Sequence, residues 1–308
     1  MKKLFNFNLL YKEIQSLPQA PEENHSMAKR VLLTLGVCML SASALAQTYG
    51  DRLNRYFGDW HTSSPREAYG HLTERDVLTQ GDPLHPSADG AVLRFVSAYK
   101  YATLAPHAAT SAIRLKDQQQ VYFVVSGEGK AVAGNQSVVL STNIALLVPA
   151  ELEFTLTNTG DQPLTMYEIQ EPVTAGFHPN TSMLVRDENS IPFSTTDLQW
   201  SYMVKKIFVA SDGLATLTDV STVYLDPLTV SRPRSTESPD MEAVWTALKG
   251  TGIAFVSNKL LRQPPGRAFL EVPDGKTPHS VINPSEDSQL KFLYFAHKPA
   301  AAPSTRPK

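Results

Sequence analysis

Val121-Tyr-Phe-Val-Val-Ser-Gly127-Glu-Gly129 is a hydrophobic segment that runs into a Gly-x-Gly turn, and it opens a pattern that the chain carries twice. A segment ending in Val148-Pro149 and an Asn-led turn at Asn158 complete the first copy. The second copy has its landmarks in the same order: Val244-Trp245, Gly250-Thr-Gly252, Val272-Pro273, Asn283 and Leu290. The intervals from Gly127 to Gly250, from Pro149 to Pro273 and from Asn158 to Asn283 are 123, 124 and 125 residues. So constant an interval predicts the tandem duplication of one β-barrel.

The body of the chain, from Ala91 to Ala296, consists of short segments rich in β-branched and aromatic residues. Turn signals separate them every ~8–12 residues, which is typical of an all-β sandwich or barrel. We expect an N-terminal arm, a first barrel, a linker rich in Pro, Asn, Ser and Thr, a second barrel and a disordered Pro/Ala-rich tail. Their ranges are 47–86, 87–171, 172–198, 199–297 and 298–308.

Residues 1–46 are expected to be an export signal. Met27-Ala-Lys-Arg30 supplies a basic start, an apolar stretch follows, and Ser41-Ala-Ser-Ala-Leu-Ala46 ends in small residues. We therefore expect a bacterial-type signal cleaved after Ala46 and a secreted or periplasmic protein, with Met27 as a candidate translation start. The apolar stretch is shorter than the ~20 residues that cross a bilayer, so no membrane span is expected after cleavage.

The amino-acid composition excludes some classes of binding partner and of catalytic chemistry. The net charge is −2, and no run of Lys and Arg follows the first 30 residues, so nucleic-acid binding is not expected. Cys38 is the only cysteine and lies within the expected signal. The cleaved protein would have no disulfide and no catalytic thiol.

The segments Val121–Gly129 and Asn158–Leu164 resemble the scaffold motifs of the cupin superfamily, and the duplication makes the chain look like a bicupin. The resemblance implies two tandem double-stranded β-helix (jelly-roll) barrels preceded by the N-terminal arm. It also implies a compact two-barrel unit or a homodimer. In cupins three His and one Glu converge inside the barrel on a divalent metal.

The first copy lacks those metal ligands. Counted from the scaffold landmarks, the two first-motif His positions, the Glu position and the second-motif His position are Ile113, Leu115, Gln120 and Phe154. Two aliphatic side chains and an aromatic ring offer no lone pair, and Gln is a weak ligand. No metal is expected in the first barrel.

The second copy keeps part of the pattern, because His279 and Asn283 match the His and Asn of the second motif. The first-motif His positions fall near Thr236 and Ser238, and neither is a His. Glu242 and Glu237 are the neighbouring carboxylates, so the remnant of the binding site would comprise these two residues with His279 and Asn283. His279 and Glu242 are its candidate metal ligands.

Two functions remain open from the sequence. The first is a secreted bicupin that has lost its metal chemistry and is a non-catalytic small-molecule-binding or structural module, without a cofactor. The second is a metal-dependent cupin enzyme, an oxidoreductase or a sugar-modifying enzyme, that acts through His279 and one divalent ion (Mn, Fe, Ni or Zn) in the second barrel. A small organic ligand is compatible with both, since small barrels hold such ligands against aromatic rings. A carboxylate within bonding reach of His279 would favour the enzyme.

Overall fold

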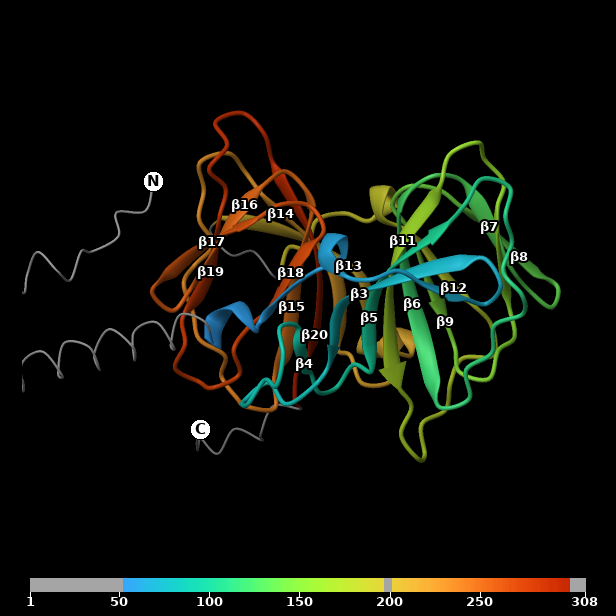
Figure 1. Cartoon of the computed structure of the whole chain (residues 1–308), viewed down its shortest axis with the longest axis horizontal. Coiled ribbons are helices and arrows are strands. Elements are labelled where there is room, and N and C mark those ends of the chain that lie inside the picture. The colour runs from blue at the N-terminus through green and yellow to red at the C-terminus, as the bar shows by residue number, and fades with distance from the viewer. Residues whose placement is uncertain (1–51, 197–200, 300–308) are drawn as a thin grey trace, which may run out of the picture. The chain divides into compact units, whose positions relative to one another are not determined.

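The computed structural model describes residues 52–196 and 201–299 (Figure 1), which belong to one compact unit that begins at Arg52. The expected export signal, the residues that follow it up to 51, and residues 300–308 of the expected tail lie outside the described residues. The regular secondary structure of the described chain is almost wholly β-strand, with short 3-10 helices η2 (Trp60–Thr62), η3 (Glu188–Ser190) and η4 (Ala210–Asp212).

The first barrel consists of two sheets. The larger sheet has the order β12-β9-β6-β11-β5-β3-β2, with β4 on β3, and the smaller has the order β10-β7-β8. The large sheet contains β2 (Arg66–Ala68), β3 (Leu72–Gln80), β4 (Ala91–Leu93), β5 (Ala98–Leu104), β6 (Gln118–Ser126), β9 (Ile144–Val148), β11 (Leu164–Pro172) and β12 (Leu184–Asp187). The small sheet contains β7 (Gly129–Ala133), β8 (Gln136–Leu140) and β10 (Thr155–Asn158).

The second barrel repeats this plan with a six-stranded sheet, β1-β18-β15-β20-β14-β13, and a three-stranded sheet, β17-β16-β19. The large sheet contains β1 (Phe57–Asp59), β13 (Tyr202–Val209), β14 (Asp219–Leu225), β15 (Glu242–Lys249), β18 (Arg267–Leu270) and β20 (Leu290–His297). The small sheet contains β16 (Gly252–Val256), β17 (Lys259–Gln263) and β19 (His279–Ile282). The prediction of an all-β chain with two jelly-roll barrels is confirmed.

The duplication extends to individual hydrogen bonds. The buried Asn158 donates through Nδ2 to the carbonyl oxygens of Leu104, Ala105 and Gln162, at 2.8–3.1 Å, and its Oδ1 accepts from a main-chain N–H two residues on. Asn283 makes the same four bonds in the second barrel, three through Nδ2 at 2.8–3.0 Å. The Asn of each motif therefore ties a turn to the end of a neighbouring strand and does not face a ligand.

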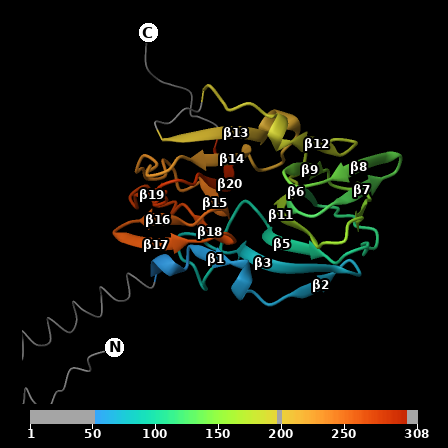
Figure 2. The same cartoon turned by 90° about the horizontal axis from the view of Figure 1, so that it is seen from above.

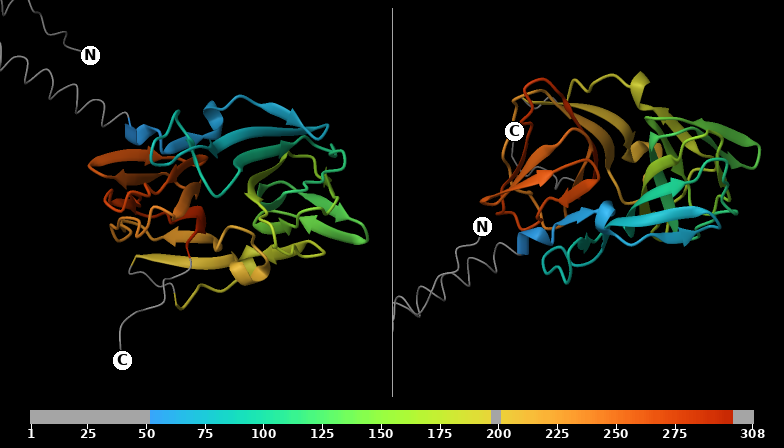
Figure 3. Two further views of the ribbon diagram at one scale, coloured as in Figure 1. Left: turned by 90° about the horizontal axis from the view of Figure 1, so that it is seen from below. Right: turned by 45° about the horizontal axis from the view of Figure 1, so that its top comes forward.

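The expected arm and linker contain strands that the two barrels exchange. β1 precedes the first barrel in the chain but pairs antiparallel with β18 of the second, Phe57 opposite Phe269 (Figure 2). β12 follows the first barrel and pairs with that barrel's β9 before the chain continues into β13. Since β9 and β18 occupy equivalent places, each repeat adds its first strand to the other repeat's sheet; the blue segment in Figure 3 crosses from the orange strands to the green ones.

The short helix after each exchanged strand is also repeated. Asp59 caps η2 by accepting from the main-chain N–H of His61, and Asp187 caps η3 by accepting from that of Asn189. Such capping satisfies an N–H that a helix terminus leaves free. The repeat thus includes part of the segments that the sequence analysis treated as arm and linker.

The largest hydrophobic cluster contains side chains of both barrels, and a second cluster belongs to the first barrel alone. Tyr99 of β5 shows how the large sheets meet: its hydroxyl donates to Thr246 of β15 at 2.7 Å, and its ring packs edge-on against Phe295 of β20. Each Å² of apolar surface that is buried contributes about 25 cal/mol to the free energy of folding. The contact between the two large sheets is therefore a major part of the hydrophobic core.

Candidate functional site

The strand register identifies which residues occupy the ligand positions of the second barrel. Ile113 and Phe154 form an isolated antiparallel bridge in the first barrel, and Arg234 and His279 form the same bridge in the second. Each bridge consists of two reciprocal main-chain hydrogen bonds of 2.8–3.1 Å. Arg234 is therefore the counterpart of Ile113, so the first ligand position is an arginine, two residues before the position obtained by counting along the sequence.

The four positions of the first barrel where cupins have metal ligands are occupied by three apolar side chains and one amide. Ile113 and Phe154 are buried in the first barrel's own hydrophobic cluster, and Leu115 is half-buried. Gln120 is buried and donates to Glu168 Oε1 at 2.7 Å. Burial raises the pKa of Glu168, although Lys100 opposes the shift. These side chains do not form a ligand set for a divalent metal.

In the second barrel the buried Glu271 is the centre of a polar cluster. Its Oε1 accepts from Trp245 Nε1 at 2.7 Å and from Arg234 Nη2 at 3.3 Å. His279 Nε2 lies 3.1 Å from the same oxygen, although the ring is not aligned for a good hydrogen bond, and its two nitrogens have no other partner among the described residues. Burial by itself would raise the pKa of Glu271, but His279, Arg234 and Trp245 outweigh it and lower the pKa to about 2. The carboxylate is an anion at neutral pH.

The carboxylates expected beside His279 lie elsewhere. Glu242 accepts from the main-chain N–H groups of Arg94, Phe95 and Val96, at 2.5–3.2 Å, and so joins the start of β15 to the loop after β4. Burial raises its pKa to about 7 against these hydrogen bonds. Glu237 is exposed. The structure thus brings His279 together with Glu271, and with neither of the two residues that the sequence suggested.

Glu271 could have been found by comparing the two repeats. The first repeat reads Ala145-Leu-Leu-Val-Pro149, whereas the second reads Ala268-Phe-Leu-Glu-Val-Pro273. The second therefore has one extra residue, and that residue is a charged one between apolar neighbours, directly after β18. A buried charge needs a partner, so this insertion was a signal for an internal ion pair.

A cavity of about 60 Å³ adjoins this cluster. Arg234, Trp245, Tyr202 and Tyr294 line it, together with the ion-paired Lys206 and Asp219. Pockets that hold drug-sized ligands have volumes of about 300–1,000 Å³, and one water takes roughly 30 Å³ of liquid. The cavity has room for one or two waters or a very small ion, and not for a larger organic molecule.

The donor set of the second barrel does not fit a divalent metal. One His and one carboxylate are available, and Arg234 places a permanent cation at a ligand position, where it would repel a metal ion. Across 52–196 and 201–299, no group of three or more His, Cys, Asp or Glu side chains could hold a metal. Asn283 is occupied by main-chain carbonyls.

Comparison with known proteins shows which protein family has this architecture. Residues 100–170 match the family model of the cupin domain, and the fold around them is a pair of jelly-roll barrels. Residues 100–170 are a cupin domain, and the chain has a two-barrel cupin fold. No match was found among curated proteins. No helix in the described part of the chain is long and apolar enough to cross a membrane.

Solved structures of very different function share the fold of this two-barrel cupin. A Pseudomonas aeruginosa protein described as glyoxylate-induced has a TM-score of 0.62 at 15% identity, over 82% of this chain and 90% of that one. Vicilin of hazelnut, Corylus avellana, has a TM-score of 0.59 at 13% identity, over 79% and 86%. Oxalate decarboxylase of Bacillus subtilis has a TM-score of 0.59 at 8% identity, over 80% and 78%. At these identities the likeness shows the fold alone, since function belongs to the site.

Proposed function

We propose that this protein is an exported bicupin that binds a small organic molecule without catalysis and without a metal ion. The observation that carries the proposal is the register of the Arg234–His279 bridge, because it puts a guanidinium at a metal-ligand position. Export is proposed from the basic, apolar and small-residue segments that end at Ala46.

The charges of the cluster support this proposal. A divalent cation normally compensates the carboxylate of a metal site. Here the guanidinium of Arg234 lies beside Glu271, while Trp245 donates to the same carboxylate. Glu271 is fully buried and Arg234 is half-buried, and a buried charge of this kind is tolerated where its partners have good geometry. The negative charge of Glu271 is therefore balanced by side chains alone.

The test is metal binding by the full chain and by the Arg234→His variant, measured by calorimetry with Mn²⁺, Ni²⁺ and Zn²⁺. We expect no binding by the wild type and a gain of binding in the variant, since the introduced imidazole would face His279 beside Glu271. Arg234→Lys is the matched control, because it keeps the positive charge and should bind no metal. Stoichiometric binding by the wild type would refute the proposal.

The second candidate function is a metal-dependent enzyme acting through the second barrel. It is favoured by one observation, the contact of a buried His with a buried carboxylate, in which His279 Nδ1 has no hydrogen-bond partner within 52–196 and 201–299. A buried nitrogen without a partner is uncommon in native proteins. This candidate requires that Arg234 be displaced when the metal binds, and the same calorimetry decides between the two.

A further inference from the structure

A second cavity, of about 350 Å³, is lined by residues of both barrels. We call it the seam pocket. Phe123 and Asn143 line it from the first barrel, and Tyr224, Lys249, Gln289 and Lys291 line it from the second. Its volume falls within the range of about 300–1,000 Å³ that small-molecule sites occupy. It is large enough for the ligand that the interior of the second barrel cannot hold.

The pocket contains two lysines placed directly opposite each other. Lys249 of β15 is the register partner of Lys291 of β20, immediately after an irregularity in the pairing. Like charges opposite each other on antiparallel strands destabilise a sheet. Lys249 is exposed, and it forms no ion pair with any residue in the described ranges.

The first barrel provides an internal comparison. The residues equivalent to this lysine pair are Ser126 and Thr165, which are also register partners beside an irregularity. Their hydroxyl oxygens are hydrogen-bonded at 2.8 Å. One repeat therefore has a compatible pair at this position, whereas the other has two cations. Violations of a local rule of this kind are expected at functional sites.

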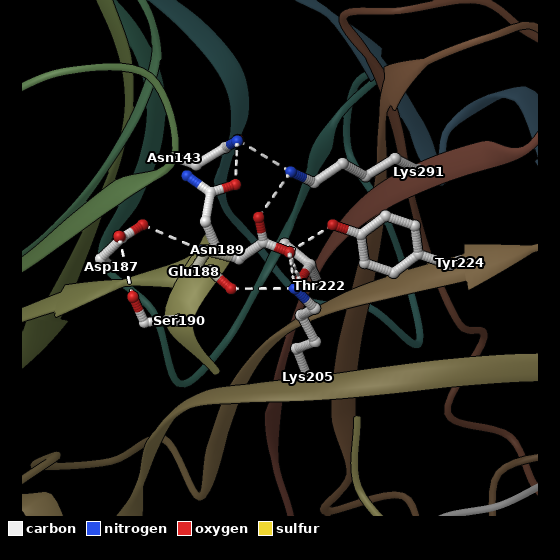
Figure 4. A network of polar contacts seen from close by, with 9 residues as sticks. All are labelled: Asn143, Asp187, Glu188, Asn189, Ser190, Lys205, Thr222, Tyr224 and Lys291. Carbon is white, nitrogen blue, oxygen red and sulfur yellow. Dashed lines mark hydrogen bonds and ion pairs between the residues drawn. The ribbon is translucent and has the colours of Figure 1, made fainter. Parts of the chain in front are cut away.

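Glu188 of η3 compensates only part of the positive charge (Figure 4). Its Oε2 accepts from Lys291 Nζ at 3.0 Å, and its Oε1 accepts from the hydroxyls of Thr222 and Tyr224. Lys205 Nζ lies 3.7 Å from Oε1. Lys291 and Lys205 thus share one carboxylate, and Lys249 has no part in it. Burial lowers the pKa of Lys291, Glu188 opposes the shift, and the charges of Lys205 and Lys249 add to it.

Asn143 holds Lys291 in the pocket from the other barrel. Its Oδ1 accepts from Lys291 Nζ at 2.8 Å, and its backbone has a φ of +73°. The equivalent residue before β18 is Gly266, with a φ of +92°. Asn tolerates this left-handed conformation less easily than Gly. Its side chain provides a contact to the lysine that a Gly could not.

Aromatic surface lies beside the cations. Lys291 Nζ is 5.5 Å from the ring centroids of both Phe123 and Tyr224. We propose that the seam pocket binds a small carboxylic acid with a flat apolar or aromatic body, whose carboxylate lies between Lys249 and Lys291. This rests on the proposed function only for the statement that a small molecule is bound. It does not depend on whether the barrels hold metal.

Calorimetry with benzoate as the probe tests the proposal on the full chain. We expect benzoate to bind the wild type, and Lys249→Ser, which introduces the residue of the first repeat, to weaken binding roughly tenfold. Lys276→Ser, an exposed lysine in a loop of the second barrel, is the control and should bind as the wild type does. Failure of the wild type to bind benzoate, or unchanged binding by Lys249→Ser, would overturn the proposal.

Thermal unfolding without ligand gives a second readout. Lys249→Ser should unfold at a higher temperature than the wild type, because it removes the repulsion, while a lysine with a purely structural role would lower that temperature when replaced. Benzoate binding measured with and without EDTA separates this inference from the proposed function. Benzoate binding that disappears with EDTA would refute the proposed metal-free function. Benzoate binding that is the same with EDTA but unchanged in Lys249→Ser would refute the seam-pocket proposal alone.

Discussion

At the scale of single residues, the two equivalent asparagines are the clearest product of the duplication. Asn158 and Asn283 are both 1% exposed, and each gives its Nδ2 to three main-chain carbonyls. Their retention does not depend on metal chemistry, because they bind only the backbone. This explains why the scaffold motif survives in both repeats although the ligand positions do not.

Replacing either asparagine by alanine should therefore destabilise its barrel. We expect Asn158→Ala and Asn283→Ala each to lower the free energy of unfolding by about 2–3 kcal/mol, since buried carbonyls lose their partner. Denaturant unfolding is the measurement. Asn54→Ala, at an exposed position, should stay within about 0.5 kcal/mol of the wild type. Equal stability of all three variants would show that the hydrogen bonds of the two asparagines do not contribute to stability.

Glu271 makes a prediction about pH. Its pKa of about 2 in the folded protein lies below the unfolded value of 4.5, so its contribution is complete above pH 4.5 and is lost as the pH falls to 2. The size of that contribution is on the order of 3 kcal/mol. Glu271→Gln should be less stable than the wild type at pH 7 and should lose less stability between pH 4.5 and 2. The exposed Glu237→Gln control should follow the wild type; identical pH profiles for all three proteins would contradict the ion pair.

At the scale of elements, the exchanged strands join the two repeats. β1 lies against β18 of the second barrel, and the chain then enters β2 and β3 of the first. Gly58 in β1 passes so close to β3 that an added Cβ would lie 1.7 Å from the carbonyl oxygen of Val77. Only glycine fits there.

Gly58→Ala should consequently displace β1 from β3 and lower the free energy of unfolding by about 2 kcal/mol or more. Gly160→Ala is the matched control, because its Cβ would make only ordinary contacts of 3.5 Å or longer. Denaturant unfolding of both variants checks this. A Gly58→Ala protein as stable as the control would mean that the close approach of β1 to β3 is absent in solution.

The sequence predicted these elements unevenly, for physical reasons. Turn glycines and alternating apolar residues are local signals, so the strands around Gly127 and Gly250 and the duplication were predictable. The register of Arg234 was not, because the inserted residues of the second repeat lengthen a loop without leaving a periodic signal. Glu242 illustrates the same limit: its sequence neighbourhood suggested a metal site, but it caps a loop 146–148 residues away.

At the scale of the whole molecule, the two repeats have diverged in different directions from one plan. The first barrel fills its ligand positions with Ile113 and Phe154, whereas the second has Arg234 and His279 there, both against the buried Glu271. The seam pocket, to which both barrels contribute, has a volume suited to a small ligand. Whether the chain also forms a homodimer stays a prediction, which sedimentation equilibrium of the full chain would check.

The central claim is that this bicupin contains no metal ion, and the most direct test is elemental analysis of the purified full chain. Mass spectrometry should find Mn, Fe, Ni and Zn far below one equivalent per chain, before and after each metal is supplied and the excess removed. His279→Ala should give the same result. One equivalent of metal in the wild type that is lost in His279→Ala would contradict the account and assign the second barrel to a metal centre.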